Sequence, residues 1–174
     1  NQTPVAPLRL DSRWDFGQQR ARIRVINRTT GDSIVRGYYA PKSNRYYAEG
    51  RFEKLPMAML DPILSGVVSE TQGMADAELE IMGKGRQASL NGSVDVKDLS
   101  TMIDYTRVRY SVPRAKIQVK DNHFIATNVR AYDKEKNSGL LTMDLSLEHL
   151  SNISYNLRIV PRNMLVLNTT LQDN

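Results

Sequence analysis

The chain has no cysteine among its 174 residues, and it contains only two histidines and one tryptophan. The absence of cysteine excludes disulfide bonds and thiol-based catalysis. Long apolar runs are also missing, since the longest candidate, residues 55–68, is interrupted by two prolines and an aspartate. A helix that crosses a membrane needs ~20 apolar residues in succession, so the sequence predicts no such helix. Hydrophobic residues make up 40% and charged residues 25%, which is typical of a folded, soluble protein.

Patterns for catalysis and metal binding are scarce. The two histidines, His123 and His149, are expected at strand ends beside polar turns, without the spacing of a metal site. The acidic residues Asp76, Glu78 and Glu80 recur at every second position. That spacing indicates the solvated face of a strand instead of a catalytic pair of carboxylates. The sequence therefore predicts a protein without enzymatic activity, cofactor or metal.

The net charge of +5 raises the question of a nucleic-acid partner. The most basic runs place arginines at positions 20, 22 and 24 and at positions 107 and 109. Binding to single-stranded nucleic acid requires exposed aromatic side chains among the basic ones, whereas the neighbours here are aliphatic. We therefore expect no nucleic-acid partner, and we expect these arginines to pair with acidic residues on neighbouring strands.

What the sequence does contain is an alternation of apolar and polar residues along most of its length. It is clearest in RARIRVI (20–26), ADAELEIM (75–82), TRVRYSV (106–112) and NISYNLRI (152–159). A period of two predicts antiparallel strands with one buried and one hydrated face. Segments rich in Gly, Asn, Asp and Pro separate the runs at intervals of roughly ten residues, as hairpin turns require. The sequence thus predicts an all-β antiparallel meander of about a dozen strands.

Two pairs of adjacent tyrosines, Tyr38–Tyr39 and Tyr46–Tyr47, fall in strands that we expect to face each other. Because side chains alternate along a strand, one member of each pair must lie on each face of the sheet. We expect the tyrosines to pack against one another across the two strands.

Two segments depart from this alternation. LPMAMLDPILSGVV (55–68) has apolar residues at a helical spacing and predicts a short helix that Pro62 interrupts. VKDLSTMI (96–103) predicts one more helical turn. The first interruption divides the expected fold into an upstream β module at residues 1–66, ending in the short helix, and a second β module at residues 73–174.

A series of short segments follows a fixed order in the second module. They are GMADAELEIMG (73–83), LNGSVDV (90–96), IDYTRVRY (103–110), FIATNVRAYD (124–133), SGLLTMDLSLEH (138–149) and NISYNLRIVPRNMLVLNTT (152–170). In this order they resemble the conserved C-terminal region of the TamB family, the translocation and assembly module proteins of Gram-negative envelopes. The first module, with GYYAPKSNRYYAEGRFEKLPMAMLDPILSG (37–66), is similar to the repeat just upstream in Bacteroidetes-type members. The resemblance covers nearly the whole chain.

The resemblance implies a fold and a function. Members of this family belong to the AsmA-like, bridge-like lipid transfer superfamily, in which a single sheet curls into an open, taco-like groove with an apolar interior. They span the periplasm from an inner-membrane anchor and work with an outer-membrane barrel of the Omp85 type, similar to TamA. The resemblance thus implies a periplasmic segment that carries phospholipid between the two membranes. Because the sequence opens at Asn1 instead of Met, we also expect a piece of a longer protein, with the anchor and the barrel contacts outside it.

The apolar side of the alternating strands supplies the residues expected to line the groove and to contact phospholipid acyl chains. The candidate lining residues are Ala77, Leu79, Ile81, Val108, Tyr110, Leu141, Met143, Leu145, Leu147, Ile153, Tyr155, Leu157 and Ile159. The candidates for a plug at the end of the groove are Met57, Leu60, Ile63 and Leu64.

Two other functions stay open at this point. In a periplasmic scaffold or chaperone, the open groove or the sheet edge receives β-strands of outer-membrane proteins by augmentation. In an ordinary binding module, the apolar faces close on one another as a β-sandwich, and the same residues form a buried core. An open apolar stripe of many hundreds of Å² exceeds what soluble domains usually expose, so the open form needs an apolar occupant.

Overall fold

The computed structural model describes residues 7–148 and 152–164, and these residues form ten strands and one short 3₁₀ helix. In chain order the elements are β1 (Leu8–Asp15), β2 (Arg20–Asn27), β3 (Ser33–Ala40), β4 (Arg45–Pro56), η1 (Met57–Leu60), β5 (Val68–Lys84), β6 (Gln87–Ile103), β7 (Val108–Lys120), β8 (His123–Tyr132), β9 (Ser138–Glu148) and β10 (Asn152–Arg162). Each strand pairs antiparallel with the next, so all ten belong to one sheet.

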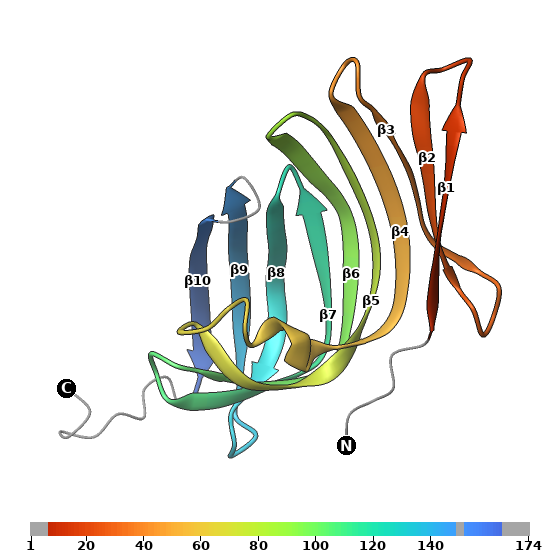
Figure 1. The fold of residues 1–174 in the computed structure, drawn as a ribbon. Coiled ribbons are helices and arrows are strands. Elements are labelled where there is room, and N and C mark those ends of the chain that lie inside the picture. The colour runs from red at the N-terminus through yellow and green to blue at the C-terminus, as the bar shows by residue number, and fades with distance from the viewer. Residues whose placement is uncertain (1–6, 149–151, 165–174) are drawn as a thin grey trace.

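The predicted all-β antiparallel meander is confirmed, and it is a single open sheet that curls as it passes from β1 to β10 (Figure 1). The two edge strands, β1 and β10, do not pair with each other, so the sheet is not closed into a barrel. The described strands form one layer, so the two-sheet sandwich considered from the sequence is not the architecture of this part of the chain.

The pairing register places apolar residues of neighbouring strands opposite one another. One line of directly paired residues crosses all ten strands and contains only apolar residues and glycine. It consists of Leu10, Val25, Val35, Gly50, Leu79, Gly92, Val119, Phe124, Leu145 and Tyr155. We call the side of the sheet that carries this line the apolar face, and the opposite side the polar face. A slip of one residue would move every apolar side chain of a strand to the polar face, so the pattern itself fixes the register.

The strand pairing shifts at five places in the described sheet, one of them between β2 and β3 at Val25 and Ile26, and the other four are β-bulges that bend the strands while the apolar residues stay on one face. The pairing of neighbouring strands shifts by one residue at each bulge, and one polar residue there has a φ between 51° and 53°. An extra residue in one strand bends that strand and increases its local twist. The apolar residues around a bulge are therefore three positions apart instead of two, as in Phe52 and Leu55. The positive-φ residues are Lys54, Glu70, Asp98 and Asn128.

The helix predicted for residues 55–68 is present only as η1, four residues long. Residues 61–67 continue as turns and a bend, because Pro62 has no N–H to continue a helical hydrogen-bond pattern. Within the described ranges, no helix is long and apolar enough to cross a membrane.

The second predicted helical turn, VKDLSTMI (96–103), is wrong, because the whole segment lies in β6. Its spacing of three between Val96 and Leu99 comes from the bulge at Asp98, where the pairing with β5 shifts. A spacing of three is shared by helices and by bulged strands, which explains the error.

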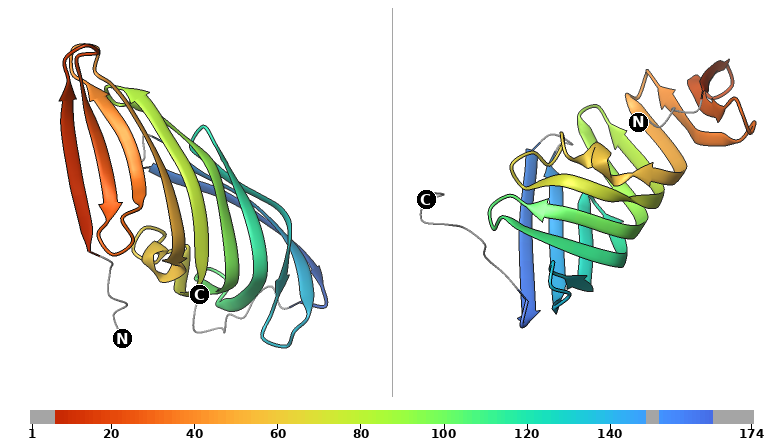
Figure 2. Two further views of the ribbon diagram at one scale, coloured as in Figure 1. Left: turned by 90° about the vertical axis from the view of Figure 1, so that its right-hand side faces the viewer. Right: turned by 90° about the horizontal axis from the view of Figure 1, so that it is seen from below.

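The core lies on the apolar face of β5–β9. Buried apolar side chains form one cluster there, and η1 lies on the inside of the curl, so that Met57 packs over it (Figure 2). The strand residues of the cluster are Ala75, Val96, Val108, Tyr110, Val112, Ala115, Ala126, Val129 and Ala131. Met164, which follows β10, completes it.

The sheet continues across the expected boundary between the two modules. β4 from the first module pairs with β5 from the second, from Arg45 opposite Lys84 to Pro56 opposite Met74. The expected division at residues 66–73 thus covers the end of the η1–β5 connection and the first residues of β5, inside one sheet, and the division into the modules 1–66 and 73–174 stays a prediction.

Candidate functional site: the apolar face of the sheet

All thirteen predicted lining residues lie on the apolar face. The register pairs Ala77, Leu79 and Ile81 of β5 with Val94, Gly92 and Leu90 of β6. Toward the β10 edge, on the same face, Leu141, Met143, Leu145 and Leu147 of β9 stand opposite Ile159, Leu157, Tyr155 and Ile153 of β10. Val108 and Tyr110 belong to the buried cluster between them. The structure therefore brings these residues onto one surface, and their contact with lipid stays a prediction.

The exposure of this face changes from strand to strand. Val108 and Leu145 are buried, at 2% and 8% exposure, and most of the other lining residues are half-buried. On the edge strands, Tyr155 is 54% exposed and Leu10 is 68% exposed. The face is thus covered in its middle and open toward both edges of the sheet.

The polar groups within the apolar face are partnered. Thr71, at 5% exposure, shares a hydroxyl hydrogen bond of 2.9 Å with Thr101. Thr101 stands opposite Tyr110, and burial raises the pKa of the Tyr110 phenol above its ordinary value. Since that phenol stays neutral at physiological pH, this part of the face carries no charge.

The plug candidates divide into two pairs. Met57 is buried, and Leu60 packs against the buried cluster. Leu64 is half-buried, whereas Ile63 is 55% exposed. The segment therefore covers the apolar face with Met57 and Leu60, while Ile63 is open to solvent and is not among the residues packed against the cluster. Its role as a plug stays a prediction.

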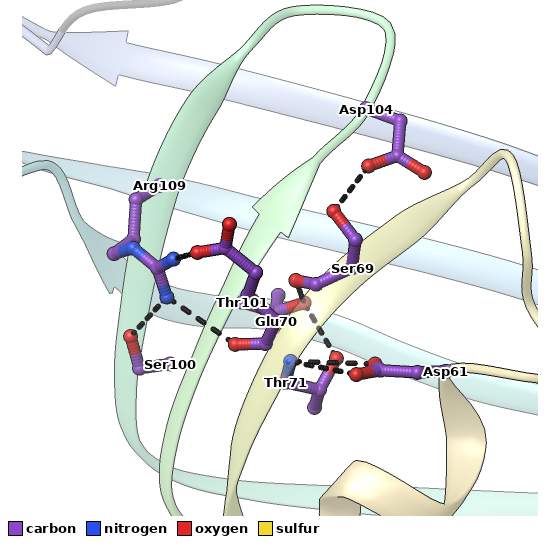
Figure 3. A network of polar contacts seen from close by, with 8 residues as sticks. All are labelled: Asp61, Ser69, Glu70, Thr71, Ser100, Thr101, Asp104 and Arg109. Carbon is purple, nitrogen blue, oxygen red and sulfur yellow. Dashed lines mark hydrogen bonds and ion pairs between the residues drawn. The ribbon is translucent and has the colours of Figure 1, made fainter.

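A polar network holds this segment to the ends of β5, β6 and β7 (Figure 3). The Asp61 carboxylate accepts the backbone N–H of Thr71 at 3.2 and 3.3 Å to its two oxygens. On the polar side, Arg109 of β7 pairs with the Glu70 carboxylate and donates to the Glu70 carbonyl at 3.3 Å. Because Glu70 is the bulged residue of β5, this ion pair fastens the bulge itself.

The polar face carries ion pairs between neighbouring strands. Arg22 of β2 pairs with Asp15 of β1 at 2.7 Å, which confirms one of the arginine pairings expected between neighbouring strands, whereas Arg109 of β7 reaches across β6 to Glu70 of β5. The three acidic residues expected on a solvated face are also partnered there. They are Asp76 with Lys97 (2.6 Å), Glu78 with Arg51 (2.5 Å) and Glu80 with the Tyr47 hydroxyl (3.5 Å). These contacts fit the solvated face that the period-two spacing predicted.

The tyrosines pack across the strands as expected. Tyr38 and Tyr47 are direct partners on the polar face, with ring centroids 6.0 Å apart. The guanidinium of Arg20 lies 4.5 Å from the Tyr38 ring centroid. Tyr39 and Tyr46 form the corresponding pair on the apolar face.

His123 lies at the start of β8, where Nδ1 is 2.9 Å from the Asp144 carboxylate. Both side chains are about half exposed, as a surface histidine at a strand end should be. His149 lies outside the described residues. Among the residues that the structure describes, no group of three or more His, Asp or Glu is placed to hold a metal ion.

The list of lining residues from sequence left out a large part of the face. It omitted β1–β4, where Leu10, Val25 and Val35 continue the apolar line. It also omitted Ala126 and Val129 of β8, which are buried in the cluster. The alternation in RARIRVI already marked Val25, whereas the bulge at Asn128 hides the pattern of β8 by separating its apolar residues by three positions.

Compared with protein-family models, with curated proteins and with solved structures, the chain gives no match in any of the three.

Proposed function

We propose that this chain is a non-enzymatic segment of a TamB-like envelope protein whose apolar face holds phospholipid acyl chains as they pass between the inner and outer membranes. The observation that carries the proposal is the unbroken apolar line from Leu10 on β1 to Tyr155 on β10. A row of this length on a single layer of strands is what a surface for apolar chains requires. The aliphatic lining offers no shape-specific polar contact, so it suits chains of different length.

The energetics favour such an occupant. Each methylene that leaves water contributes about 0.8 kcal/mol, so roughly ten methylenes on the apolar face contribute about 8 kcal/mol. Burial of the exposed Leu10, Trp14 and Tyr155 side chains against the same acyl chains adds to this gain. An apolar ligand therefore needs no salt bridge or metal to be held here.

The dimensions of the sheet also suit more than one lipid. Ten strands spaced by about 4.8 Å make a sheet roughly 43 Å wide, whereas the acyl chains of one bilayer leaflet extend about 15 Å. Several chains therefore fit side by side across the strands. Under this proposal the segment works in the periplasm, and an Omp85-type barrel of the outer membrane contacts regions outside it.

Open sheet edges support a second candidate, a scaffold or chaperone that receives β-strands of outer-membrane proteins. β1 and β10 are the edge strands of the described sheet, and an edge presents free backbone N–H and C=O groups for strand addition. The edges are also protected, since Arg9, Asp11 and Arg13 alternate along β1 and Pro161 lies in β10. Charges and proline on an edge oppose strand addition, so we rank this candidate second.

Native mass spectrometry of the chain purified from a Gram-negative host tests the proposal. We expect one or more phospholipids to remain bound, to be released at higher collision energy and to be identified after extraction. A lipid-free monomer that takes up neither added phospholipid nor a hydrophobic dye would contradict the lipid function. Binding of an extended barrel-strand peptide by that lipid-free protein would instead favour the scaffold.

A further inference from the structure

Three hairpin turns lie together at one end of the sheet, those joining β1 to β2, β3 to β4 and β5 to β6 (Figure 1). The backbone N–H of Gly85 donates to the carbonyl of Asn44 at 2.9 Å, so the second and third turns touch. This end of the apolar face therefore has a continuous border made of turn residues.

The border is basic. We call Lys42, Arg45, Lys84 and Arg86 the basic rim; all four side chains are exposed. Arg45 and Lys84 are direct cross-strand partners at the polar-face side of this border, and like charges in that position repel each other. None of the four has an acidic partner among the described residues. The rim thus concentrates positive charge that the protein itself does not neutralise.

The carboxylates at this end of the sheet are already engaged: Asp121 in the β7–β8 turn accepts the Ser89 hydroxyl at 2.8 Å, and Asp15 is held in the first turn. Asp15 accepts the backbone N–H of Gln18 at 3.0 Å and pairs with Arg22 at 2.7 Å. The hydrogen bond from Gln18, followed by the contact with Arg22, lowers the pKa of Asp15. The turns at the opposite end are mixed in charge, because Asp104 accompanies Arg107 and Asp133 and Glu135 accompany two lysines. The turns at 41–44 and 85–86 contain basic residues and no acidic residue, which distinguishes the rim from these mixed turns.

Aromatic side chains stand between the rim and the aliphatic part of the apolar face. Trp14, Tyr39 and Tyr46 lie in one cross-strand line, with Ala21 between the first two. The Tyr39 hydroxyl is 3.2 Å from the Asn44 side-chain oxygen, and the Tyr46 hydroxyl donates to the Gln87 carbonyl at 3.2 Å. The rings thus belong to the apolar face while the hydroxyls reach the turns. Aromatic residues take this position where hydrocarbon meets phosphate in membrane proteins.

The rim end is also hollowed. Trp14, Phe16, Gln19, Pro41 and Lys42 line a hollow of about 350 Å³ between the first two turns. Phe16 is 85% exposed and Trp14 is 42% exposed, so apolar surface lies open beside the lysine. Apolar walls with one cationic group match the boundary between the tail and the head group of a lipid.

We propose that this hollow and the basic rim bind the phosphate head group of a net-anionic phospholipid, whose acyl chains run from the aromatic line onto the aliphatic part of the apolar face. The inference rests on the proposed function and adds a head-group preference and an orientation to it. Lys42 contacts the phosphate, and Arg45, Lys84 and Arg86 supply the surrounding positive potential. Phosphatidylglycerol, with a net charge of −1, is the probe, and zwitterionic phosphatidylcholine with the same acyl chains is its comparison.

The test incubates the intact chain with an equimolar mixture of the two lipids in detergent micelles and measures bound lipid by native mass spectrometry. The variant Lys42→Gln, Arg45→Gln, Lys84→Gln, Arg86→Gln removes the rim charge. The control Arg28→Gln, Arg107→Gln, Lys134→Gln, Lys136→Gln removes the same charge at the opposite end. We expect the wild type and the control to prefer phosphatidylglycerol roughly fivefold. We expect the rim variant to load the same total lipid without preference.

Four other results would contradict the inference, and each identifies which part of it fails. Lipid loading without preference in the wild type, or a preference that survives in the rim variant, overturns the head-group site and leaves the lipid function standing. No lipid loading by the wild type overturns both. Displacement of phosphatidylglycerol by millimolar inorganic phosphate would assign the rim to free phosphate and overturn the head-group assignment. Circular dichroism of both variants confirms that the sheet is intact before these comparisons are made.

Discussion

Leu145 on β9 and Tyr155 on β10 are direct cross-strand partners on the apolar face, yet Leu145 is 8% exposed and Tyr155 is 54% exposed. One step between neighbouring strands thus takes the face from buried to open. The pair therefore allows lipid contact and the stability of the fold to be tested separately. A charge at the exposed position can be hydrated, whereas a charge at the buried position cannot.

Tyr155→Asp should reduce bound phospholipid severalfold and change the free energy of unfolding by no more than about 0.5 kcal/mol. Leu145→Asp should reduce bound lipid as well but destabilise the fold by roughly 3 kcal/mol, because it buries an unpaired carboxylate. Native mass spectrometry gives the lipid content, and urea unfolding gives the stability.

The matched control is Asn156→Asp, which places the same charge at the next position of β10, on the polar face. It should leave the bound lipid unchanged and destabilise the fold only slightly, by about 0.5 kcal/mol, because Asp144 stands directly opposite it. If Tyr155→Asp and Asn156→Asp bind equal amounts of lipid, the two faces do not differ in lipid contact and the assignment of the lining residues fails.

Gly92 has a φ of +139°, and a Cβ built on it would lie 2.0 Å from the carbonyl oxygen of Glu78. Gly92→Ala should therefore cost 2 kcal/mol or more, on the order expected for a strained backbone with a steric clash. Gly31→Ala is the control, because Gly31 has a φ of +79° with no atom within 4 Å of its Cβ position. It should cost about 1 kcal/mol. Equal losses in denaturant unfolding would mean that β5 and β6 are not as closely packed at Gly92 as described.

Much of this fold is predictable from alternation alone, since the period of two gives the strands and the turn residues give the meander. The bulges are the main exception. Val96 and Leu99 are separated by three positions, and only the pairing with β5 shows that the extra residue is Asp98 in a strand. The curl follows from these bulges, so a sequence read without pairing partners predicts the sheet and misses where it bends.

The candidate site, too, is predictable from the sequence only in part: the lining residues are, and the basic rim is not. The alternation marked the lining residues because it depends on neighbours along one strand. The basic rim depends on which turns meet, and the contact of Gly85 with Asn44 joins positions far apart in the sequence. Neither Lys42 nor Arg86 stands out in the sequence, because each hairpin turn contributes only two basic residues, in the segments PKSNR (41–45) and GKGR (83–86).

The covering segment around η1 is expected to respond unequally to two matched substitutions. Leu60→Ser should increase the binding of a hydrophobic dye with little loss of sheet signal in circular dichroism, because Leu60 packs on the buried cluster and its loss uncovers the apolar face. Ile63→Ser should change little, since Ile63 is 55% exposed. Parallel losses of melting temperature and sheet signal in Leu60→Ser, without added dye binding, would make the segment a core connector instead of a plug.

Asp76 should make stability dependent on pH in the acidic range. The contact with Lys97 first, and then the backbone N–H of Lys54, holds the pKa of Asp76 below its ordinary value of 3.8. A carboxyl with a depressed pKa in the folded state stabilises the fold above its unfolded pKa, and this contribution is lost as pH falls through the folded pKa. The free energy of unfolding should therefore decrease less steeply below about pH 4 in Asp76→Asn than in the wild type.

Lys97→Met is the companion variant, because it removes the cation that contacts Asp76 and leaves the carboxylate in place. Its free energy of unfolding should also decrease less steeply below about pH 4 than that of the wild type. If the free energy of unfolding falls equally steeply below about pH 4 in Asp76→Asn and in the wild type, the contact with Lys97 adds nothing to stability in solution.

The central claim is that acyl chains occupy the apolar face, and photocrosslinking tests it most directly. The chain is loaded with a phospholipid that carries a photoreactive group in its acyl chain, irradiated and mapped by peptide mass spectrometry. We predict crosslinks at apolar-face residues such as Val25, Leu79 and Leu141, and not at their polar-face neighbours Arg24, Glu78 and Thr142. Crosslinks spread equally over both faces, or confined to the polar face, would contradict the account.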